Sequence, residues 1–268
     1  MKNFSLLILI SSAILSLVSV SCTPIAKESK PVKLTIYAGM TLRYALIDIH
    51  KIYNLEKPNV TITYKFAPSG ILKKAIERGD RVDIFMPVNL QDMEDLQSKE
   101  FLLTETRQNL LKNRMVLIAP KNTKGISNFK DLTREQVKKV ALGNVKNTAS
   151  GKYAWEILTD LGVLERIKSK LIFTSNSYEV VSFVENGKTD AGISYATDAI
   201  LSNRIKIVEL APEESHKPIV YPVAVLKSSS NIPEAKEFIQ FLRGARAEAV
   251  FLKYRFTINS NTSKVTMN

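Results

Sequence analysis

The spacing of hydrophobic and polar residues along this chain changes repeatedly between the period of a strand and the period of a helix. Residues 60–67, VTITYKFA, alternate as a half-buried strand does, whereas residues 41–55 place apolar side chains three and four positions apart. Short apolar runs such as MVLIAP at residues 115–120 are typical of buried strands. The alternation of strands with helices predicts an α/β fold, with mixed, mainly parallel sheets flanked by helices.

Most of the expected elements have clear boundaries. A turn around Ser69 follows the strand at residues 60–67, and the helix after this turn is expected to end at Gly79. The buried face of that helix is expected to hold Ile71, Leu72, Ala75 and Ile76. Further strands are expected at residues 33–39, 82–88, 115–120, 140–144, 171–176, 191–196, 205–210 and 219–226, and further helices at residues 92–98, 150–161, 178–186, 233–242 and 245–254.

The N-terminus has a different pattern. Residues 4–20, FSLLILISSAILSLVSV, are apolar or small and carry no charge, and Cys22, the single cysteine, follows them closely. This pattern predicts a signal peptide of the lipoprotein type at residues 1–22, in which the Cys22 thiol receives the lipid. Cleavage nearby, with Cys22 lost or unused, is the alternative. Residues 23–31 are then a polar tether, and residues 260–268 a loose polar tail.

The formal net charge is +12, and the lysines are distributed over the whole length without a run of five. A nucleic-acid-binding protein usually gathers its basic residues on one helix or patch, so a solvated basic surface is the expectation, with no nucleic acid as partner. The two histidines have neither a further histidine or cysteine beside them nor an evident nucleophile. The sequence therefore predicts no metal site and no enzyme activity.

Small hydroxyl residues recur where a strand gives way to a helix. Thr41, Ser69, Ser150 and Ser177 each stand at or beside the start of an expected helix. Helix N-termini offer free N–H groups and positive potential, and ligands of open α/β sheets bind beyond the carboxyl ends of the strands. Because serine and threonine are also preferred N-caps, ordinary capping explains each position taken alone. The repetition indicates a site for an oxyanion.

The chain resembles the periplasmic molybdate-binding proteins of ABC importers over residues 32–259. Several sequence blocks in the same order carry the resemblance. These blocks are YAGMTLRYAL at 37–46, FAPSGIL at 66–72, GDRVDIFMPVN at 79–89, TRQNLLKNRMVLIAPK at 106–121, SGKYAWEIL at 150–158, DAGISYATDA at 190–199, EESHKPIVYPVAV at 213–225 and KYRFTI at 253–258.

The resemblance implies a ligand set of uncharged donors. By position, Thr41 and Ser69 match two hydroxyl ligands of the family, Ser150 and Ser177 match two backbone N–H donors, and Tyr195 matches a phenol ligand. The metal atom would be bound only as its oxyanion, with no cofactor. Three departures bear on the choice of anion: Thr41 replaces serine, Ser150 replaces alanine, and Pro68 and Gly70 replace small polar residues beside Ser69.

The resemblance also implies a two-lobed periplasmic-binding-protein fold, type II-like, with the ligand cleft between the lobes. We expect lobe I at residues 32–111 plus 199–259, and lobe II at residues 112–198. The function implied is that of an exported, lipid-anchored monomer that captures molybdate, and tungstate with it, and delivers the anion to an ABC permease. The alternatives are the same fold binding sulfate or phosphate, and a basic surface lipoprotein used for adhesion or nucleic-acid binding.

Overall fold

The computed structural model describes residues 30–259, and these residues form two α/β lobes, each built on its own sheet. The expected signal peptide with Cys22, the tether up to residue 29 and the tail at residues 260–268 lie outside the described residues. Short 3-10 turns connect several elements, at Met40–Leu42, Thr104–Thr106, Phe129–Thr133, Lys168–Lys170 and Glu213–Ser215.

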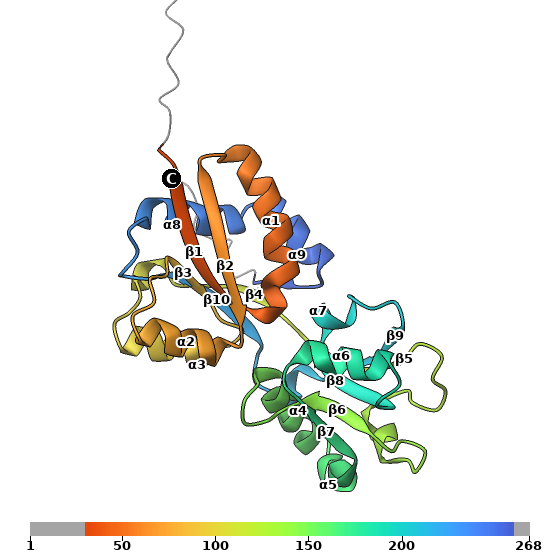
Figure 1. Ribbon diagram of the computed structural model, residues 1–268. Coiled ribbons are helices and arrows are strands. Elements are labelled where there is room, and N and C mark those ends of the chain that lie inside the picture. The colour runs from red at the N-terminus through yellow and green to blue at the C-terminus, as the bar shows by residue number, and fades with distance from the viewer. Residues whose placement is uncertain (1–29, 260–268) are drawn as a thin grey trace, which may run out of the picture. The chain divides into compact units, whose positions relative to one another are not determined.

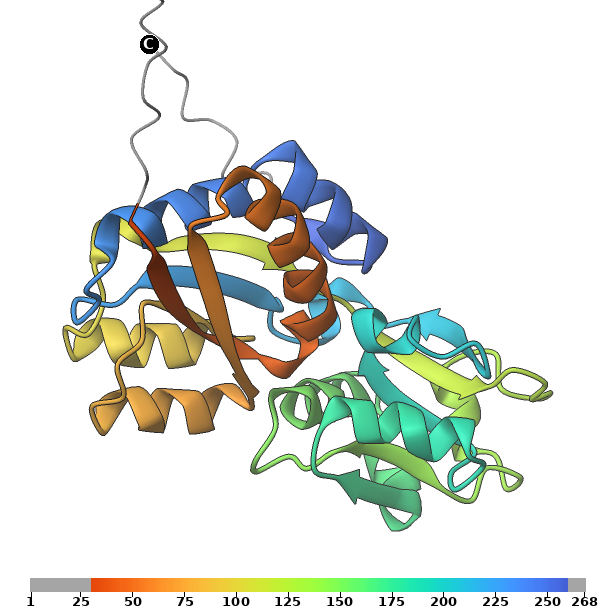
Figure 2. The same ribbon diagram turned by 45° about the horizontal axis from the view of Figure 1, so that its top comes forward.

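Lobe I is built on a six-stranded sheet in the order β11-β4-β10-β3-β1-β2 (Figure 1). β1 pairs in parallel with β2 and β3, whereas β10 runs antiparallel to β3 and β4, and β11 runs antiparallel to β4. Figure 2 shows β10 between β3 and β4, near the middle of this sheet. The strands are β1 (Val32–Gly39), β2 (Val60–Ala67), β3 (Ile84–Met86), β4 (Gln108–Lys112), β10 (Val220–Val225) and β11 (Thr257–Ile258).

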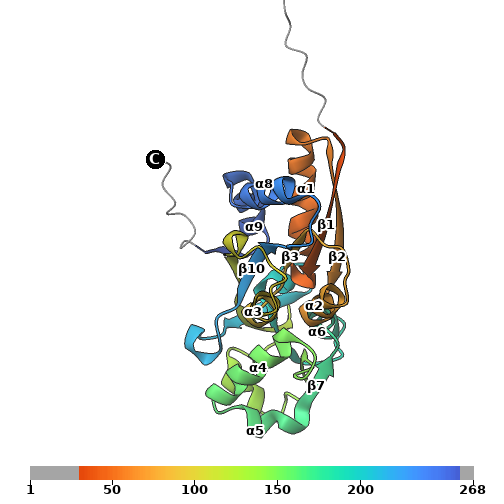
Figure 3. The same cartoon turned by 90° about the vertical axis from the view of Figure 1, so that its left-hand side faces the viewer.

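Helices cover both faces of the lobe I sheet (Figure 3). Leu34 and Ile36 of β1 pack in the core under one set of helices, and Tyr37, which points to the other face, packs in the core under the second set. This alternation along β1 is the two-residue period of a strand that is buried on both faces. The first set is α1 (Arg43–Glu56), α8 (Ile232–Leu242) and α9 (Ala245–Lys253), and the second is α2 (Ser69–Glu77) and α3 (Leu90–Ser98).

Lobe II is built on a five-stranded sheet in the order β7-β6-β8-β5-β9. β6 pairs in parallel with β7 and β8, and β5 runs antiparallel to β8 and β9. Its strands are β5 (Met115–Pro120), β6 (Val140–Gly143), β7 (Leu171–Thr174), β8 (Ala191–Tyr195) and β9 (Ile205–Leu210). α4 (Ala149–Asp160) and α5 (Leu164–Ile167) cover one face, and α6 (Ser177–Glu185) and α7 (Ala196–Ala199) cover the other (Figure 1).

The structure corrects the expected division between the lobes at one point. The expected boundary at residue 198 places β9 in lobe I, but β9 pairs with β5 along the edge of the lobe II sheet. Residues 199–210 therefore belong with lobe II. The chain passes from lobe I to lobe II between β4 and β5, and returns between β9 and β10.

Three smaller expectations also differ from the structure. The sheets are mixed rather than mainly parallel, since among the described strand pairs four are parallel and five antiparallel. α1 begins at Arg43, after a 3-10 turn that holds Thr41. Ile71 is 55% exposed, because the buried face of α2 consists of Leu72, Ala75 and Ile76.

Candidate functional site

Two of the expected ligands lie at the carboxyl ends of neighbouring parallel strands in lobe I. β1 and β2 run side by side until Gly39 faces Ala67. Thr41 follows β1 in its 3-10 turn, and Ser69 follows β2 as the first residue of α2. Both side chains are buried. This edge of a parallel pair is where ligands of α/β sheets bind, and both residues lie at the strand-to-helix junctions that the sequence predicts.

Ser69 does not cap its helix. Pro68 occupies the N-cap position of α2, and the Ser69 Oγ instead accepts a hydrogen bond from the backbone N–H of Val88 at 2.9 Å. Because an oxygen that accepts from an N–H still carries its own proton, the hydroxyl can donate in another direction. Within residues 30–259 the structure records no acceptor for that proton. Ser69 is thus held by one bond and can form a second.

Thr41 is connected to a polar network at the point where the chain leaves lobe I. Its Oγ1 lies 3.1 Å from the phenol oxygen of Tyr221 on β10. Asn113, between β4 and β5, donates through Nδ2 to the same phenol oxygen at 2.7 Å and to Thr197 Oγ1 at 3.0 Å. All four side chains are buried. The network ties a candidate ligand residue to both lobes.

In lobe II, Ser150 and Ser177 lie in the first turns of helices that follow neighbouring parallel strands. α4 follows β6, and its N-cap Thr148 accepts from the N–H of Gly151 at 3.0 Å. α6 follows β7, and its N-cap Asn176 accepts from the N–H of Glu179 at 3.0 Å. The first four N–H groups of an α-helix have no intrahelical acceptor. The N–H groups of Ser150 and Ser177 therefore remain donors at the positive ends of two helices.

The Ser150 hydroxyl points back toward its own cap. Its Oγ lies 3.4 Å from Thr148 Oγ1, and Gly143 at the end of β6 lies under both side chains. A Cβ at Gly143 would overlap with Thr148 Oγ1, and a Cβ at Gly151 would overlap with the carbonyl oxygen of Gly143. The two glycines thus let the first turn of α4 lie directly on the end of β6.

Tyr195 ends β8 with a buried hydroxyl. Its side chain is 2% exposed, and within the described residues its phenol oxygen has no hydrogen-bond partner. Burial raises the pKa of Tyr195 well above its usual value, so the phenol remains a proton donor. Buried polar groups in proteins almost always have a partner, and an unpaired one suggests a ligand or water that completes it.

Asp198 is a second buried group at this place, three residues after Tyr195. Burial raises its pKa from 3.8 to about 7, and hydrogen bonds from the side chains of Ser177 and Thr197 oppose this rise. Its Oδ2 has no hydrogen-bond partner among the described residues. Burial therefore favours the protonated carboxyl, next to one of the candidate donors.

Comparison with known proteins identifies the family. Residues 34–257 match the family model described as bacterial extracellular solute-binding protein. The chain belongs to this family. It is 33% identical to the Bacillus subtilis protein YvgL, provisionally named an ABC transporter substrate-binding lipoprotein, over 96% of this chain and 98% of that one. It is also 33% identical to the molybdate-binding protein ModA of Escherichia coli, over 84% of this chain and 89% of the relative.

A solved structure agrees with this assignment. The substrate-binding domain of a provisionally assigned molybdenum ABC transporter from Clostridium difficile matches with a TM-score of 0.75 and 35% identity, covering 84% of this chain and 98% of that chain. The two-lobed α/β fold expected from the sequence is confirmed. Because the family consists of solute-binding proteins, the expectation that the chain is not an enzyme is confirmed as well.

The five expected site residues of this solute-binding protein are all buried and uncharged. Two charged groups lie beside them in the chain or in space: Asp198 is hydrogen-bonded by the Ser177 side chain, and Arg43 comes two residues after Thr41. Arg43 is exposed. The residues expected to hold a ligand are thus hydroxyls and helix N–H groups rather than cations. Residues 30–259 contain no cluster of histidine, cysteine or carboxylate side chains suited to a metal ion.

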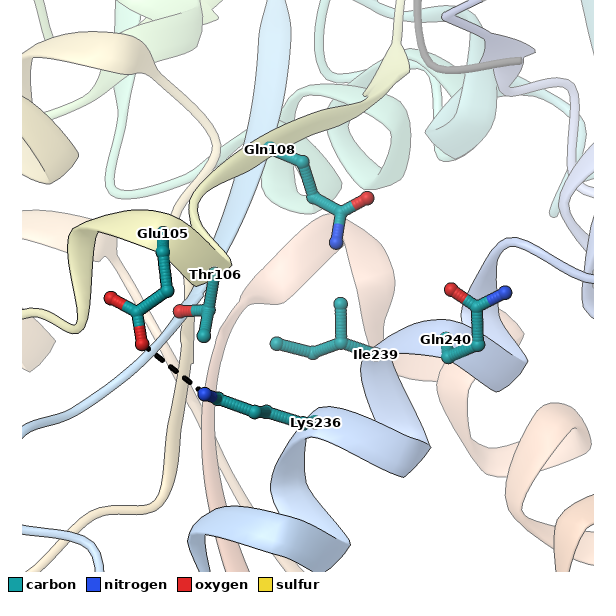
Figure 4. Close-up of a pocket in the computed structure, with 6 residues that line it drawn as sticks. All are labelled: Glu105, Thr106, Gln108, Lys236, Ile239 and Gln240. Atoms are coloured by element: carbon teal, nitrogen blue, oxygen red, sulfur yellow. Dashed lines mark hydrogen bonds and ion pairs between the residues drawn. The ribbon is translucent and has the colours of Figure 1, made fainter. Parts of the chain in front are cut away.

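Two surface grooves lie elsewhere in the solute-binding protein. One runs between α8 and the start of β4 in lobe I, where Lys236 pairs with Glu105 at 3.2 Å (Figure 4). The other lies over α4, between Trp155 and His216. Neither groove contains an expected site residue. Within residues 30–259, no helix has the length and apolarity needed to cross a membrane.

Sequence analysis missed the polar residues that support the site, namely Asn113, Tyr178, Thr197 and Tyr221. One of them had a visible signal. Tyr221 precedes a proline inside a strand, where the register shifts. Their contacts join segments that are far apart in the sequence, so the pattern around each one could not reveal its partner.

Proposed function

We propose that this solute-binding protein captures molybdate, and tungstate with it, between its two lobes and delivers the anion to an ABC permease. The observation that carries the proposal is the set of buried, uncharged donors at the carboxyl ends of parallel strands in both lobes. They are the hydroxyls of Thr41, Ser69 and Tyr195 and the backbone N–H groups of Ser150 and Ser177. The E. coli and C. difficile relatives, named for molybdate and molybdenum, supply the choice of anion.

The chemistry of these groups suits a fully deprotonated oxyanion. Hydrogen bonds to a charged partner contribute about 1.5–3 kcal/mol each, and helix dipoles add positive potential without a cationic side chain. Donors cannot satisfy a proton that the anion still carries. The set therefore disfavours phosphate, which is partly protonated near neutral pH, compared with molybdate. Asp198 stands near the site as an acceptor, and for this reason phosphate belongs among the anions to be tested.

Calorimetric titration of the mature domain with sodium salts at one pH and ionic strength tests the proposal. We expect molybdate and tungstate to bind within about tenfold of each other, because hydrogen bonds cannot easily distinguish two anions of nearly equal size. Sulfate is smaller and leaves some donors out of reach. An unmade bond costs about 1–3 kcal/mol, so sulfate should bind at least about a hundredfold more weakly.

Two results would favour the other candidates. Sulfate or phosphate binding as tightly as molybdate would mean that Thr41, Ser150 and the residues beside Ser69 form a pocket for a different oxyanion. Salt-sensitive DNA binding without any oxyanion effect would favour a basic surface lipoprotein.

The location, oligomeric state and membrane anchoring of the protein are part of the same proposal. The protein acts outside the cytoplasm as a monomer without a cofactor, held to the membrane by a lipid on Cys22. The apolar segment before Cys22 supports this, as does the lipoprotein name of the B. subtilis relative.

A further inference from the structure

One hydrogen bond joins the two lobes away from the places where the chain crosses between them. The phenol of Tyr178 in α6 donates to the backbone carbonyl of Met40 at 2.8 Å, and the two residues are 138 positions apart. Tyr178 follows Ser177, a candidate ligand of lobe II. Met40 precedes Thr41, a candidate ligand of lobe I. The bond thus connects the two sides of the proposed site through residues adjacent to its donors.

The ring of Tyr178 makes a second contact with lobe I. It meets the ring of Tyr44 on α1 edge-on, with the centroids 6.4 Å apart and the planes at 76°. Aromatic pairs of this geometry are favourable beyond the area that they bury. Tyr178 therefore contacts lobe I through both its hydroxyl and its ring.

The other recorded links between the lobes differ in position. Asn113, within the crossing segment between β4 and β5, bonds to Tyr221 and Thr197. Lys217, within the second crossing segment between β9 and β10, donates through its backbone N–H to Glu156 of α4 at 2.9 Å. Bonds at a hinge can persist while domains rotate about it, because the hinge residues move least. The bond from Tyr178 in α6 to the turn at Met40 lies away from both crossing segments. It can therefore form only when lobe I and lobe II are in contact at this place.

We propose that Tyr178 is a positioning residue that holds the lobes closed around the bound anion without touching it. This inference rests on the proposed function for the identity of the anion. A contact made only in the closed state raises the fraction of molecules in that state, and the apparent affinity rises with it. The expected contribution is that of one neutral hydrogen bond, about 2- to 10-fold in the dissociation constant.

The phenol can fill this role over the whole useful pH range. Burial, and then the negative charge of Asp198, raise the pKa of Tyr178 above its usual value, while Arg43 lowers it. Tyr221 and Tyr44 are the other titratable groups that act on it. Because the hydroxyl stays protonated, it remains a donor to the carbonyl of Met40.

The test uses the substitution Tyr178→Phe, which keeps the ring and removes the hydroxyl. Tyr44→Phe is the matched control, because it removes a phenol hydroxyl from the other ring of the pair, and within residues 30–259 that hydroxyl makes no hydrogen bond. We expect Tyr178→Phe to release molybdate about 2- to 10-fold faster in stopped-flow measurements, with the association rate and the molybdate-to-sulfate affinity ratio unchanged. Tyr44→Phe should behave as the unsubstituted protein.

A second measurement does not depend on the anion. Small-angle X-ray scattering of the ligand-free proteins should give a larger radius of gyration for Tyr178→Phe than for Tyr44→Phe. Equal radii together with equal release rates would overturn the inference, and so would a changed affinity ratio, which would mean that Tyr178 contacts the anion. If the unsubstituted protein does not bind molybdate, the proposed function fails, and the radii alone decide whether Tyr178 holds the lobes closed.

Discussion

At the scale of single residues, the site depends on side chains that already have one partner and can take another. Ser69 accepts from the N–H of Val88 and still has a proton to donate. The Thr41 hydroxyl donates to the phenol oxygen of Tyr221, which also accepts from Asn113, and the Thr41 oxygen can still accept a further hydrogen bond. Each of these proposed ligand residues is thereby oriented before an anion arrives, and less ordering is needed on binding.

Substitution of Ser69→Ala should therefore have two separate effects. Loss of a bond to the anion should weaken molybdate binding by about 1.5–3 kcal/mol. The buried N–H of Val88 also loses its acceptor, so the free energy of unfolding without ligand should fall by about 1–3 kcal/mol. Calorimetry and denaturant unfolding measure the two effects, with exposed Ser98→Ala as control. Molybdate affinity within twofold of the unsubstituted protein would remove Ser69 from the site.

The buried carboxyl of Asp198 should make stability depend on pH. Its pKa is raised in the folded protein, so its proton stabilises the fold below about pH 4, and this contribution is lost as the pH rises to about 7. A rise from 3.8 to about 7 corresponds to roughly 4 kcal/mol. Asp198→Asn imitates the neutral acid, and its unfolding free energy should fall less over this range. Exposed Asp160→Asn is the control, and parallel pH profiles for all three proteins would contradict the assignment.

At the scale of elements, the site is built where strands end and helices begin. The first turn of α4 can present the Ser150 N–H because Gly143 and Gly151 allow the helix to lie on the end of β6. α2 is different, since a Cβ at Gly70 would meet no atom within 4 Å. Glycine is thus required by packing in α4 but not in α2.

This contrast gives a paired test. Gly151→Ala would place a methyl group against the carbonyl oxygen of Gly143 and displace the first turn of α4. We expect a lower melting temperature and at least about tenfold weaker molybdate binding, because the displaced N–H of Ser150 loses its geometry. Gly70→Ala should instead stabilise α2 by about 0.5–1 kcal/mol. Gly151→Ala with unchanged melting temperature and affinity would contradict the packing described for α4.

The sequence predicts some helices and strands of this molecule more accurately than others. Residues 60–67 and the helices after β6 and β7 were placed within one or two residues, because their hydrophobic periodicity is clear. The sequence pattern does not predict β4 as a strand, and it predicts β9 in lobe I rather than in lobe II. Both differences arise because the pairing of a strand depends on partners that are distant in the sequence. The candidate donors came from the resemblance and from strand-to-helix junctions. The network at Asn113 could not be predicted, because its bonds join segments more than 80 residues apart.

At the scale of the whole molecule, the surface charge acts on an anion before the proposed site does. The net charge of +12 attracts anions over a distance set by ionic strength, whereas the proposed ligand set contains no cation. Charge thus affects how fast an anion arrives, and the geometry of the donors decides which anion stays.

Anchoring is tested at Cys22. We expect Cys22→Ser to abolish labelling with radioactive palmitate and to release the protein from the membrane fraction or block its maturation, because the thiol that carries the lipid is gone. The mature domain should bind molybdate unchanged. Palmitate labelling equal to that of the unsubstituted protein would exclude Cys22 as the attachment point.

The position of β10 in the lobe I sheet determines the order in which the molecule can fold. All five strands of lobe II come from one continuous stretch, residues 115–210. The sheet of lobe I instead needs β10, which lies between β3 and β4 but begins only at Val220. Closing so long a loop is entropically costly, and contacts between distant segments form slowly. We expect lobe II to acquire protection from hydrogen exchange first during refolding, and lobe I to complete its sheet last.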